Sequence, residues 1–311
     1  MTGSLYLPLA ASELDRDATM RDHPELFDLL WNEPLTRVLA MFEGQVLLND
    51  DGTALRLLSV EQVPSAQLRA YLGKTTHPQG SEPAGSPIVL AVLSKNAADQ
   101  LSADSQWHGL RKAGTGLSAR DVGLFTQGLA LANWHHTHAH CPACGTPTVV
   151  QQGGWSRRCF NDDRQVFPRT DPAIIVSVID AEDRILLGGQ RVWEENRWSV
   201  LAGYVEPGES LEAAVIREVF EEAGIRVVDP VFLGSQSWPF PYSLMLGYTA
   251  KANPSFGSQE PVPDGEEIVR ARWFSRQELA TEAPDLVLPS KLTIARALID
   301  RWFGEDIPGH A

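Results

Sequence analysis

Apolar and polar residues in the first part of the chain are arranged as in a mixed unit of helices and strands. An amphipathic run over residues 25–31 predicts a helix. Short apolar runs bounded by turn residues predict strands over residues 37–42, 45–48, 54–58 and 88–93. Residues 73–86 are rich in Gly, Pro, Ser and Thr, which is typical of a loop. Ser118 and Asp121 form a capping box, and the run behind it predicts a helix that continues to about Trp134.

The second half of the chain has the pattern of a larger α/β unit. Apolar runs predict strands over residues 174–179, 185–188, 198–201, 227–233, 244–250 and 269–274. Between the third and fourth of these strands lies an amphipathic segment, with Ser210 as its N-cap and Gly224 as the residue that ends it. The apolar side of this helix is expected to consist of Leu211, Val215, Ile216, Val219, Phe220 and Ala223. A terminal helix is expected over residues 292–303.

Length, charge and cysteine content limit the class of protein. At 311 residues, with 43% hydrophobic residues, the chain can form two domains with packed cores and a small insert. Its net charge of −14 argues against non-specific binding to nucleic acid or to anionic membranes. No stretch approaches a membrane span, and residues 1–20 lack the pattern of a secretion signal. Because the three cysteines are clustered, we expect a reducing compartment and place the protein in the cytoplasm.

A cluster of candidate metal ligands follows the first unit. Cys141 and Cys144 form a CxxCG knuckle, and Cys159 begins a second one. A structural zinc site needs four ligands, and Asp162 stands where the fourth cysteine would be. Rival ligands just upstream are His135, His136, His138 and His140. We expect a closed Zn²⁺ site that stabilises a segment with little core of its own, with a metal-free remnant as the alternative.

Three glutamates of the helix behind Ser210 indicate a second kind of metal site. Glu218, Glu221 and Glu222 are three and four residues apart, so their carboxylates lie over one helical turn. Such carboxylates repel one another, and Mg²⁺ or Mn²⁺ would remove that repulsion. The simplest alternative is a solvated acidic face. Arg217 is expected to form a salt bridge with a glutamate such as Glu209.

An aromatic segment follows this helix and could contact a ring. It reads Ser235-Gln236-Ser237-Trp238-Pro239-Phe240-Pro241-Tyr242-Ser243. Its prolines stiffen the backbone, and its aromatic side chains either offer flat faces to a base or nicotinamide ring or pack on the protein's own core.

These motifs together resemble a known family. Gly203, Glu209, Arg217, Glu218, Val219, Glu221, Glu222, Gly224 and Ile225 match the Nudix box, and Nudix proteins hydrolyse a nucleoside diphosphate linked to another group. The aromatic segment is similar to the S-Q-P-W-P-F-P-x-S signature of the NADH pyrophosphatase family. Trp134-His135, the CxxCG knuckle and Phe167-Pro168-Arg169-Thr170-Asp171-Pro172-Ala173-Ile174-Ile175 resemble that family's zinc ribbon and its junction with the Nudix domain.

The resemblance implies a fold and an activity. The fold would be an α/β/α Nudix sandwich over residues 169–311, with a zinc ribbon over 137–168 and an N-terminal α+β domain over 1–136. The activity would be metal-dependent hydrolysis of NAD(H) to nicotinamide mononucleotide and AMP by a homodimer, and removal of NAD caps from RNA 5′ ends.

The resemblance also implies site residues. The Mg²⁺ or Mn²⁺ ligands would be the carbonyl of Ala202 with Glu218, Glu222 and Glu267, and Glu221 would complete the cluster or position the attacking water. The general base stays open between Glu221, Glu267 and a metal-bound hydroxide. Substrate contacts would come from Gln236, Ser237, Trp238, Pro239, Phe240, Pro241, Tyr242, Ser243 and Ala295, with Arg111 and Phe167 as further candidates.

The chain departs from the family pattern at three positions, and two alternative functions stay open. Ser237 replaces a proline, Asp162 replaces a zinc cysteine, and Phe167 stands where a tyrosine is frequent. One alternative keeps the fold but changes the substrate to ADP-ribose, a nucleotide sugar or another capped RNA. The other is a regulator in which a zinc ribbon binds nucleic acid while the Nudix fold senses a nucleotide. A local basic run could serve that role: Arg157, Arg158, Arg164 and Arg169.

Overall fold

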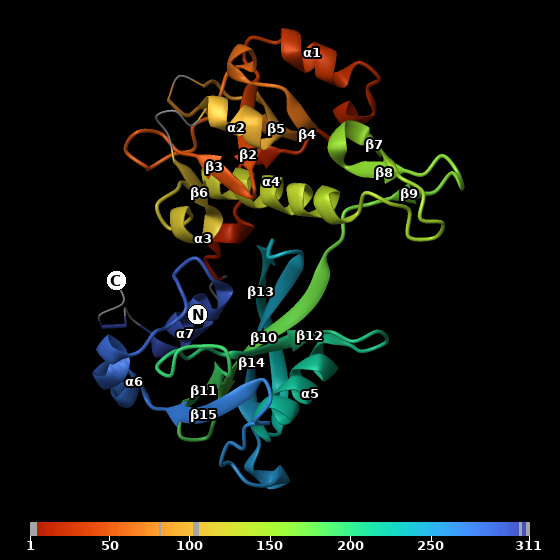
Figure 1. The fold of residues 1–311 in the computed structure, drawn as a ribbon. Helices are drawn as coiled ribbons and strands as arrows, with labels where there is room; N and C mark the ends of the chain where they lie inside the picture. Colours follow the sequence, from red (N-terminus) through yellow and green to blue (C-terminus); the bar gives the residue numbers. More distant parts are fainter. Residues whose placement is uncertain (1–4, 81, 102–105, 305–306, 309–311) are drawn as a thin grey trace. The chain divides into compact units, whose positions relative to one another are not determined.

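The computed structural model describes residues 5–80, 82–101, 106–304 and 307–308 (Figure 1). The chain divides into two compact units. The N-terminal unit consists of Pro8–Thr170 and Trp238–Tyr242, and the C-terminal unit consists of Met1–Leu7, Asp171–Ser237 and Ser243–Ala311. The three domain boundaries expected from the sequence stay a prediction. Among the described residues, no helix has the length and apolar character needed to cross a membrane.

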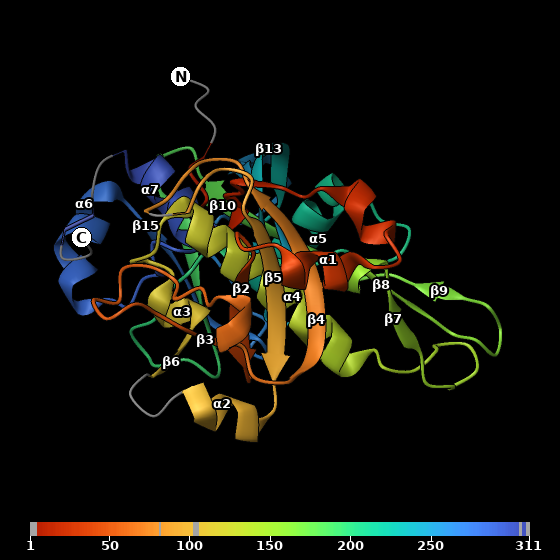
Figure 2. The ribbon, with the colours of Figure 1, turned by 90° about the horizontal axis from the view of Figure 1, so that it is seen from above.

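The N-terminal unit is built around a six-stranded sheet (Figure 2). Its strands, in spatial order, are β1 (Leu14–Asp15), β4 (Ala66–Thr75), β5 (Pro87–Leu93), β2 (Arg37–Phe42), β3 (Gln45–Leu47) and β6 (Trp107–Gly109). β2 and β5 run parallel, and the other pairs are antiparallel.

Helices cover both faces of this sheet. Successive strand residues point to opposite sides, so neighbouring residues of β5 contact helices on different faces. Val89 of β5 packs in a cluster with α1 (Leu26–Asn32), and Ala91 packs with α2 (Lys95–Leu101). Leu90, one residue from each, faces α4 (Ala119–Thr137), because a Cβ on Gly128 of that helix would lie 3.4 Å from it. The short helix α3 (Leu110–Ala113) follows β6.

The structure corrects two sequence predictions in this unit. Residues 54–58 are not a strand and form only isolated bridges at Leu55 and Leu58. The predicted loop over 73–86 begins only after Thr75, because β4 extends through Gly73. Gly73 is needed inside the strand: its φ is +127°, and a Cβ there would lie 2.2 Å from the carbonyl oxygen of Asp15. The glycine that indicated a loop therefore marks the close approach of β1. Ser81, within that predicted loop, lies outside the described residues.

Only half of the predicted capping box at α4 is present. Ser118 Oγ accepts the backbone N–H of Asp121 at 3.2 Å. The carboxylate of Asp121 turns into the core, where it accepts the N–H of Leu55 at 2.9 Å and pairs with Arg120. The helix start is thus as predicted, but Asp121 stabilises the segment around Leu55 instead of its own N-cap.

The zinc-ribbon segment forms a three-stranded sheet within the N-terminal unit. Its strands are β7 (Val149–Gln151), β8 (Ser156–Arg158) and β9 (Gln165–Val166). Gly154 lets it approach β4, because a Cβ at that position would lie 2.5 Å from that of Ala70. Trp155 Nε1 donates to the carbonyl of Tyr71 at 2.7 Å, and the Arg21 guanidinium covers its ring at 3.7 Å. The segment is therefore packed against the rest of this unit.

The C-terminal unit is an α/β/α sandwich (Figure 1), and the α/β prediction is confirmed. Its central sheet has the order β13 (Val227–Trp238), β14 (Ser243–Ala252), β10 (Asp171–Ile179), β11 (Ile185–Gln190) and β15 (Ile268–Phe274), and β12 (Leu201–Tyr204) also pairs with β10. One face packs on α5 (Leu211–Ala223) through Val215, Val219 and Ala223. The other packs on α6 (Arg276–Glu282) and α7 (Ile294–Phe303) through Leu279, Leu298 and Ile299.

Three sequence predictions for this unit need correction. The strand expected over 198–201 is β12, which begins at Leu201. The sequence prediction missed α6, although Ser275 and Glu278 form a complete capping box at its start. Ile216 and Phe220 do not belong to the buried side of α5, since they are 39% and 41% exposed. The guanidinium of Arg226 lies 4.1 Å from the Phe220 ring and covers part of it.

Candidate functional site

The core of the candidate site is the contact between β12 and α5. Gly203 on β12 faces Glu218 so closely that a Cβ on Gly203 would lie 2.0 Å from the carboxyl carbon of Glu218. Ser210 caps α5 by accepting the N–H of Ala213, and Gly224 ends it with a φ of +69°. The glycine and the glutamates of the motif are therefore required together, because the strand must leave room for a carboxylate.

Arg217 links the outer carboxylates of the motif. Its guanidinium binds Glu209 through two nitrogens, at 2.8 and 2.9 Å, and donates to the carbonyl of Tyr204 at 3.0 Å. Its third nitrogen lies 2.8 Å from Glu218 and 3.0 Å from Glu221. These hydrogen bonds, those to Glu209 above all, raise the pKa of Arg217 and lower that of Glu209. The predicted salt bridge with Glu209 is confirmed.

Glu222 is a buried acid that forms no salt bridge with the basic side chains the structure describes. Its side chain is 5% exposed, and its Oε2 has no hydrogen-bond partner among the described residues. Burial raises the pKa of Glu222 to about 9, helped by the charges of Glu267, Glu218 and Asp264 and opposed by a hydrogen bond from the Ala202 backbone. Burial also raises the pKa of Glu218. A hard divalent cation fits this oxygen-rich donor set, because it would neutralise the charge and fill the free position on Oε2.

The predicted ligands do not occupy equal positions in this site. Glu267 lies in the exposed turn before β15, yet its charge acts on both Glu218 and Glu222. Glu221 is 57% exposed and binds Arg217, so it lies toward solvent. Sequence reasoning missed Gln190, which donates to Glu267 Oε1 at 3.0 Å, and Asp264, whose carboxylate binds the turn that carries Glu267. The turn-forming Asp-Gly at 264–265 was the available signal for Asp264; nothing local marked Gln190.

The central part of the aromatic segment, Trp238–Tyr242, belongs to the N-terminal unit. There it lines one side of a pocket of about 750 Å³. The guanidinium of Arg111 lies 4.3 Å from the ring centre of Phe240 and 5.3 Å from that of Trp238. The pocket is lined by Glu43, Gly44, Gln45, Gln106, Trp107, His108, Gly109, Leu110, Arg111, Lys112, Leu129, Asn133, His136, Thr137, Pro239, Phe240, Pro241 and Tyr242. It thus offers aromatic faces beside basic groups.

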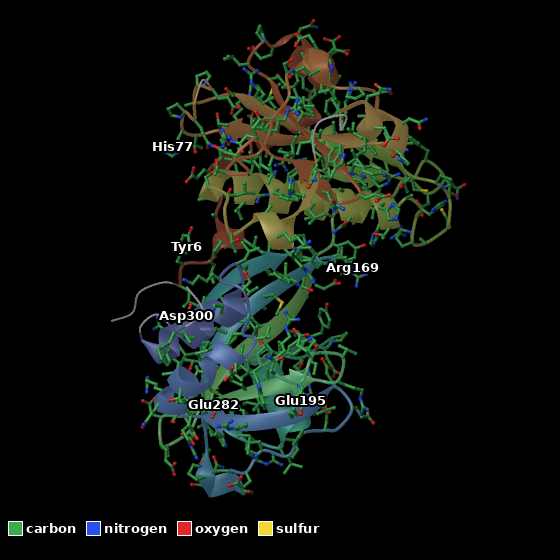
Figure 3. All side chains as sticks on the ribbon, turned by 60° about the vertical axis from the view of Figure 1, so that its left-hand side comes forward. Tyr6, His77, Arg169, Glu195, Glu282 and Asp300 are labelled. Atoms are coloured by element: carbon green, nitrogen blue, oxygen red, sulfur yellow. The ribbon has the colours of Figure 1, made fainter. Side chains whose placement is uncertain are left out.

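Side chains of α4 hold this segment in place. Asn133 donates to the carbonyl of Pro239 at 2.9 Å, and Thr137 hydrogen-bonds the Tyr242 hydroxyl. Arg169, labelled in Figure 3, lies 5.8 Å from the ring centre of Tyr242. Phe167, also in the N-terminal unit, is 58% exposed.

Three of the predicted substrate contacts, Gln236, Ser243 and Ala295, are buried in the C-terminal unit. Gln236 is 1% exposed; its amide accepts the N–H of Ile294 at 2.7 Å and donates to the carbonyl of Leu292 at 2.9 Å. Ala295, on α7, is buried in the core of this unit. Ser243 is also buried, and its hydroxyl lies 3.0 Å from that of Tyr204. The side chain of Gln236 therefore fixes the start of α7. Ser237, next to it, is half-buried.

A second group of ligands lies in the zinc-ribbon segment. The sulfurs of Cys141, Cys144 and Cys159 and a carboxylate oxygen of Asp162 all lie within 4.8 Å of one another. Three sulfurs and one carboxylate in a compact group fit a tetrahedral zinc ion. Hydrogen bonds from Thr146 lower the pKa of the exposed Cys144 to about 6, which favours the thiolate that a metal requires.

The upstream histidine His135 is engaged elsewhere. Its Nε2 lies 2.8 Å from the carbonyl of Gly154, and its Nδ1 lies 2.9 Å from a guanidinium nitrogen of Arg157. Burial lowers the pKa of His135 to about 4. A neutral ring that donates through Nε2 and accepts at Nδ1 satisfies both contacts, so His135 joins α4 to the ribbon and is not a rival zinc ligand.

Comparisons with known proteins match three successive segments. A model of the NUDIX domain matches residues 168–297, one of the NADH pyrophosphatase zinc ribbon domain matches 136–167, and one of the NADH pyrophosphatase-like rudimentary NUDIX domain matches 35–134. The chain is similar to the NAD-capped RNA hydrolase NudC of Mycobacterium tuberculosis, with 41% identity over 88% of this chain and 85% of the relative. It is also similar to that of Pseudomonas syringae pv. syringae, with 38% identity over 71% of this chain and 74% of the relative.

Proposed function

The chain belongs to the NADH pyrophosphatase family of Nudix hydrolases, and we propose that it hydrolyses the central pyrophosphate of NAD(H) to NMN(H) and AMP. We further propose that it removes NAD caps from RNA 5′ ends, the activity for which its relatives are named. The observation that carries the proposal is Glu222, a buried acid with a partnerless oxygen beside Glu218 and Glu267. Such a group is costly unless a cation binds it.

The cation is proposed to be Mg²⁺ or Mn²⁺. Its ligands would be the Ala202 carbonyl, Glu218, Glu221, Glu222 and Glu267. When bound, the ion polarises the pyrophosphate oxygens and lowers the pKa of a coordinated water. Arg217 holds Glu209 and Glu218 in place, and its ion pairs keep Glu221 oriented at the solvent side of the site. Glu221 and Glu267 are the groups that could accept a proton from the attacking water.

The specificity for NAD(H) is proposed to come from the aromatic segment. A cation held by the carboxylates would contact only the pyrophosphate, which every nucleoside diphosphate shares, so contacts with the rings would have to discriminate between substrates. Arg111 with Trp238 and Phe240 provides a positive charge over aromatic faces, which suits a phosphate attached to a ring. Phe167 offers a further exposed face. Substrate contacts from Ser237, Pro241 and the buried Gln236, Ser243 and Ala295, and a homodimeric assembly, are proposed from the family resemblance.

The structural zinc ion is proposed to bind Cys141, Cys144, Cys159 and Asp162. Its role would be to stabilise the ribbon, with no part in hydrolysis, because all four positions of a tetrahedral ion would be filled by protein.

ADP-ribose is the second candidate substrate, because it shares the pyrophosphate and the adenosine of NAD.

A substrate comparison tests the proposal. NAD, NADH, ADP-ribose and NAD-capped RNA would be incubated separately with the protein and Mn²⁺, and initial rates measured by chromatography. We expect kcat/KM for NADH or NAD-capped RNA to exceed that for ADP-ribose by at least about tenfold, since one lost ring contact has that effect. A higher value for ADP-ribose would replace NAD(H) as the substrate while keeping the Nudix chemistry.

A further inference from the structure

The turn that carries Glu267 is held by polar contacts. It spans residues 262–267, and Val262, Glu266 and Glu267 are exposed, so the turn has little apolar packing to fix it. A metal ligand needs a fixed position, because a carboxylate that moves freely loses entropy when it binds. The turn must therefore be ordered by hydrogen bonds.

One carboxylate oxygen organises this turn. Asp264 Oδ1 accepts the backbone N–H groups of Glu266 at 2.7 Å, Glu267 at 3.0 Å and Ile268 at 3.0 Å. A carboxylate is a strong acceptor for three converging N–H groups. Gly265 completes the ring with a φ of +74° and donates its own N–H to the carbonyl of Ile268 at 3.0 Å.

The same turn is joined to the end of α5, which carries Glu222, and to β11. The N–H of Val262 donates to the carbonyl of Ala223 at 2.8 Å, and that of Asp264 to the carbonyl of Glu222 at 3.3 Å. Gln190, the last residue of β11, donates through Nε2 to Glu267 Oε1 at 3.0 Å, and the N–H of Arg191, the next residue, donates to the Glu267 carbonyl at 3.0 Å. Both the backbone and the carboxylate of Glu267 are thus fixed relative to Glu222.

We propose that Asp264 and Gln190 are positioning residues for the divalent cation: Asp264 shapes the turn, Gln190 aims the carboxylate, and both act through Glu267. The inference rests on the proposed function, because it takes Glu267 as a ligand of that cation. Asp264 is assigned this structural role because its Oδ1 is occupied by three N–H groups of the turn. Partners of this kind that hold a metal ligand typically contribute ten- to a hundredfold in metal affinity.

The test is Mn²⁺ binding by calorimetry and by electron paramagnetic resonance, without any nucleotide. D264A should weaken Mn²⁺ binding about tenfold, because the turn loses its acceptor, and Q190A about threefold or more, because the turn survives. D264N keeps an acceptor oxygen while it loses the charge, so its affinity should stay within about threefold of the parent's. Equal losses in D264A and D264N would overturn the proposal, because Asp264 would then act only by its charge.

Two controls separate positioning from general destabilisation. Asp180 is a matched residue in the turn between β10 and β11: its Oδ1 accepts the N–H groups of Glu182 at 3.0 Å and Arg184 at 2.8 Å. D180A should lower the melting temperature and leave Mn²⁺ affinity unchanged. In an E267Q protein, adding D264A should weaken Mn²⁺ binding no further, and a second tenfold loss there would overturn the proposal.

Mn²⁺ binding and NAD(H) cleavage are measured separately, so a failure of the positioning role can be told from a failure of the substrate assignment. A parent that binds no Mn²⁺ would overturn both the proposed metal site and the positioning role. A parent that binds Mn²⁺ with the expected variant pattern but does not cleave NAD(H) would keep the positioning role and remove only the substrate.

Discussion

The Nudix-box site and the zinc-ribbon cluster both gather acidic or thiol groups, but they differ in what holds them. Glu218 and Glu222 project from one helix packed on a sheet, so their positions are set without a metal. The ribbon ligands come from two short loops, and the sheet beside them has strands of only two or three residues. The comparison predicts that a cation would act as a reagent in the helix-borne site and as a part of the fold in the ribbon.

The largest expected effect is that of Glu222→Gln. Neutralising a cation ligand should lower turnover by about two to four orders of magnitude while the fold stays intact. Initial rates and circular dichroism would be measured on the same samples. Activity within threefold of the parent would remove Glu222 from the ligand set.

Cys144→Ser should lower the stability of the fold and leave the Nudix-box site intact, which is the opposite of what we expect for Glu222→Gln. The zinc content should fall from about one per chain to well below one, and the N-terminal unit should lose stability, because the ribbon packs on β4. Mn²⁺ binding at the box should stay unchanged. Metal analysis of the parent purified without chelator comes first: a protein without zinc would end the comparison, and full zinc in Asp162→Ala would reassign the fourth ligand.

The aromatic segment should respond to substitution with an intermediate effect. Trp238→Ala or Phe240→Ala should lower kcat/KM for NADH about ten- to a hundredfold, because a stacked ring contributes roughly 1 to 3 kcal/mol. ADP-ribose should lose less at whichever residue contacts the nicotinamide. Equal losses for both substrates at both positions would indicate that the segment supports the N-terminal unit instead.

How much the sequence could predict follows the same division between local and long-range structure. The box helix with its cap, its ending glycine and the Arg217–Glu209 pair depends on residues within one segment, and these predictions are confirmed. The predicted loop began at Gly73, inside β4, because that glycine is needed for contact with β1, a strand far away in sequence. The carboxylate of Asp121 binds the N–H of Leu55 instead of its own N-cap. Gln190 binds Glu267, which is 77 positions away in sequence. No local pattern encodes such partners.

A pH dependence of stability, with no readout in activity, is expected in protein freed of the box cation. Burial raises the pKa of Glu222 to about 9 in the folded state, above its ordinary value of 4.5. Its stabilising contribution is therefore complete below pH 4.5 and is lost as the pH rises toward 9, by at most about 1.4 kcal/mol per pH unit. Chemical unfolding of the parent between pH 5 and 9 should show this decline. Glu222→Gln should flatten it, and an equal slope in both proteins would contradict the burial of an acid there.

Product analysis tests whether Glu218, Glu222 and Glu267 would hold a divalent cation for hydrolysis of the pyrophosphate of NAD. The parent protein would be incubated with NAD and Mn²⁺, and all nucleotide products quantified by chromatography. Equimolar NMN and AMP, formed only with the divalent cation present, is the result that we predict. Release of nicotinamide with ADP-ribose, or NMN and AMP formed equally well in excess chelator, would contradict the claim.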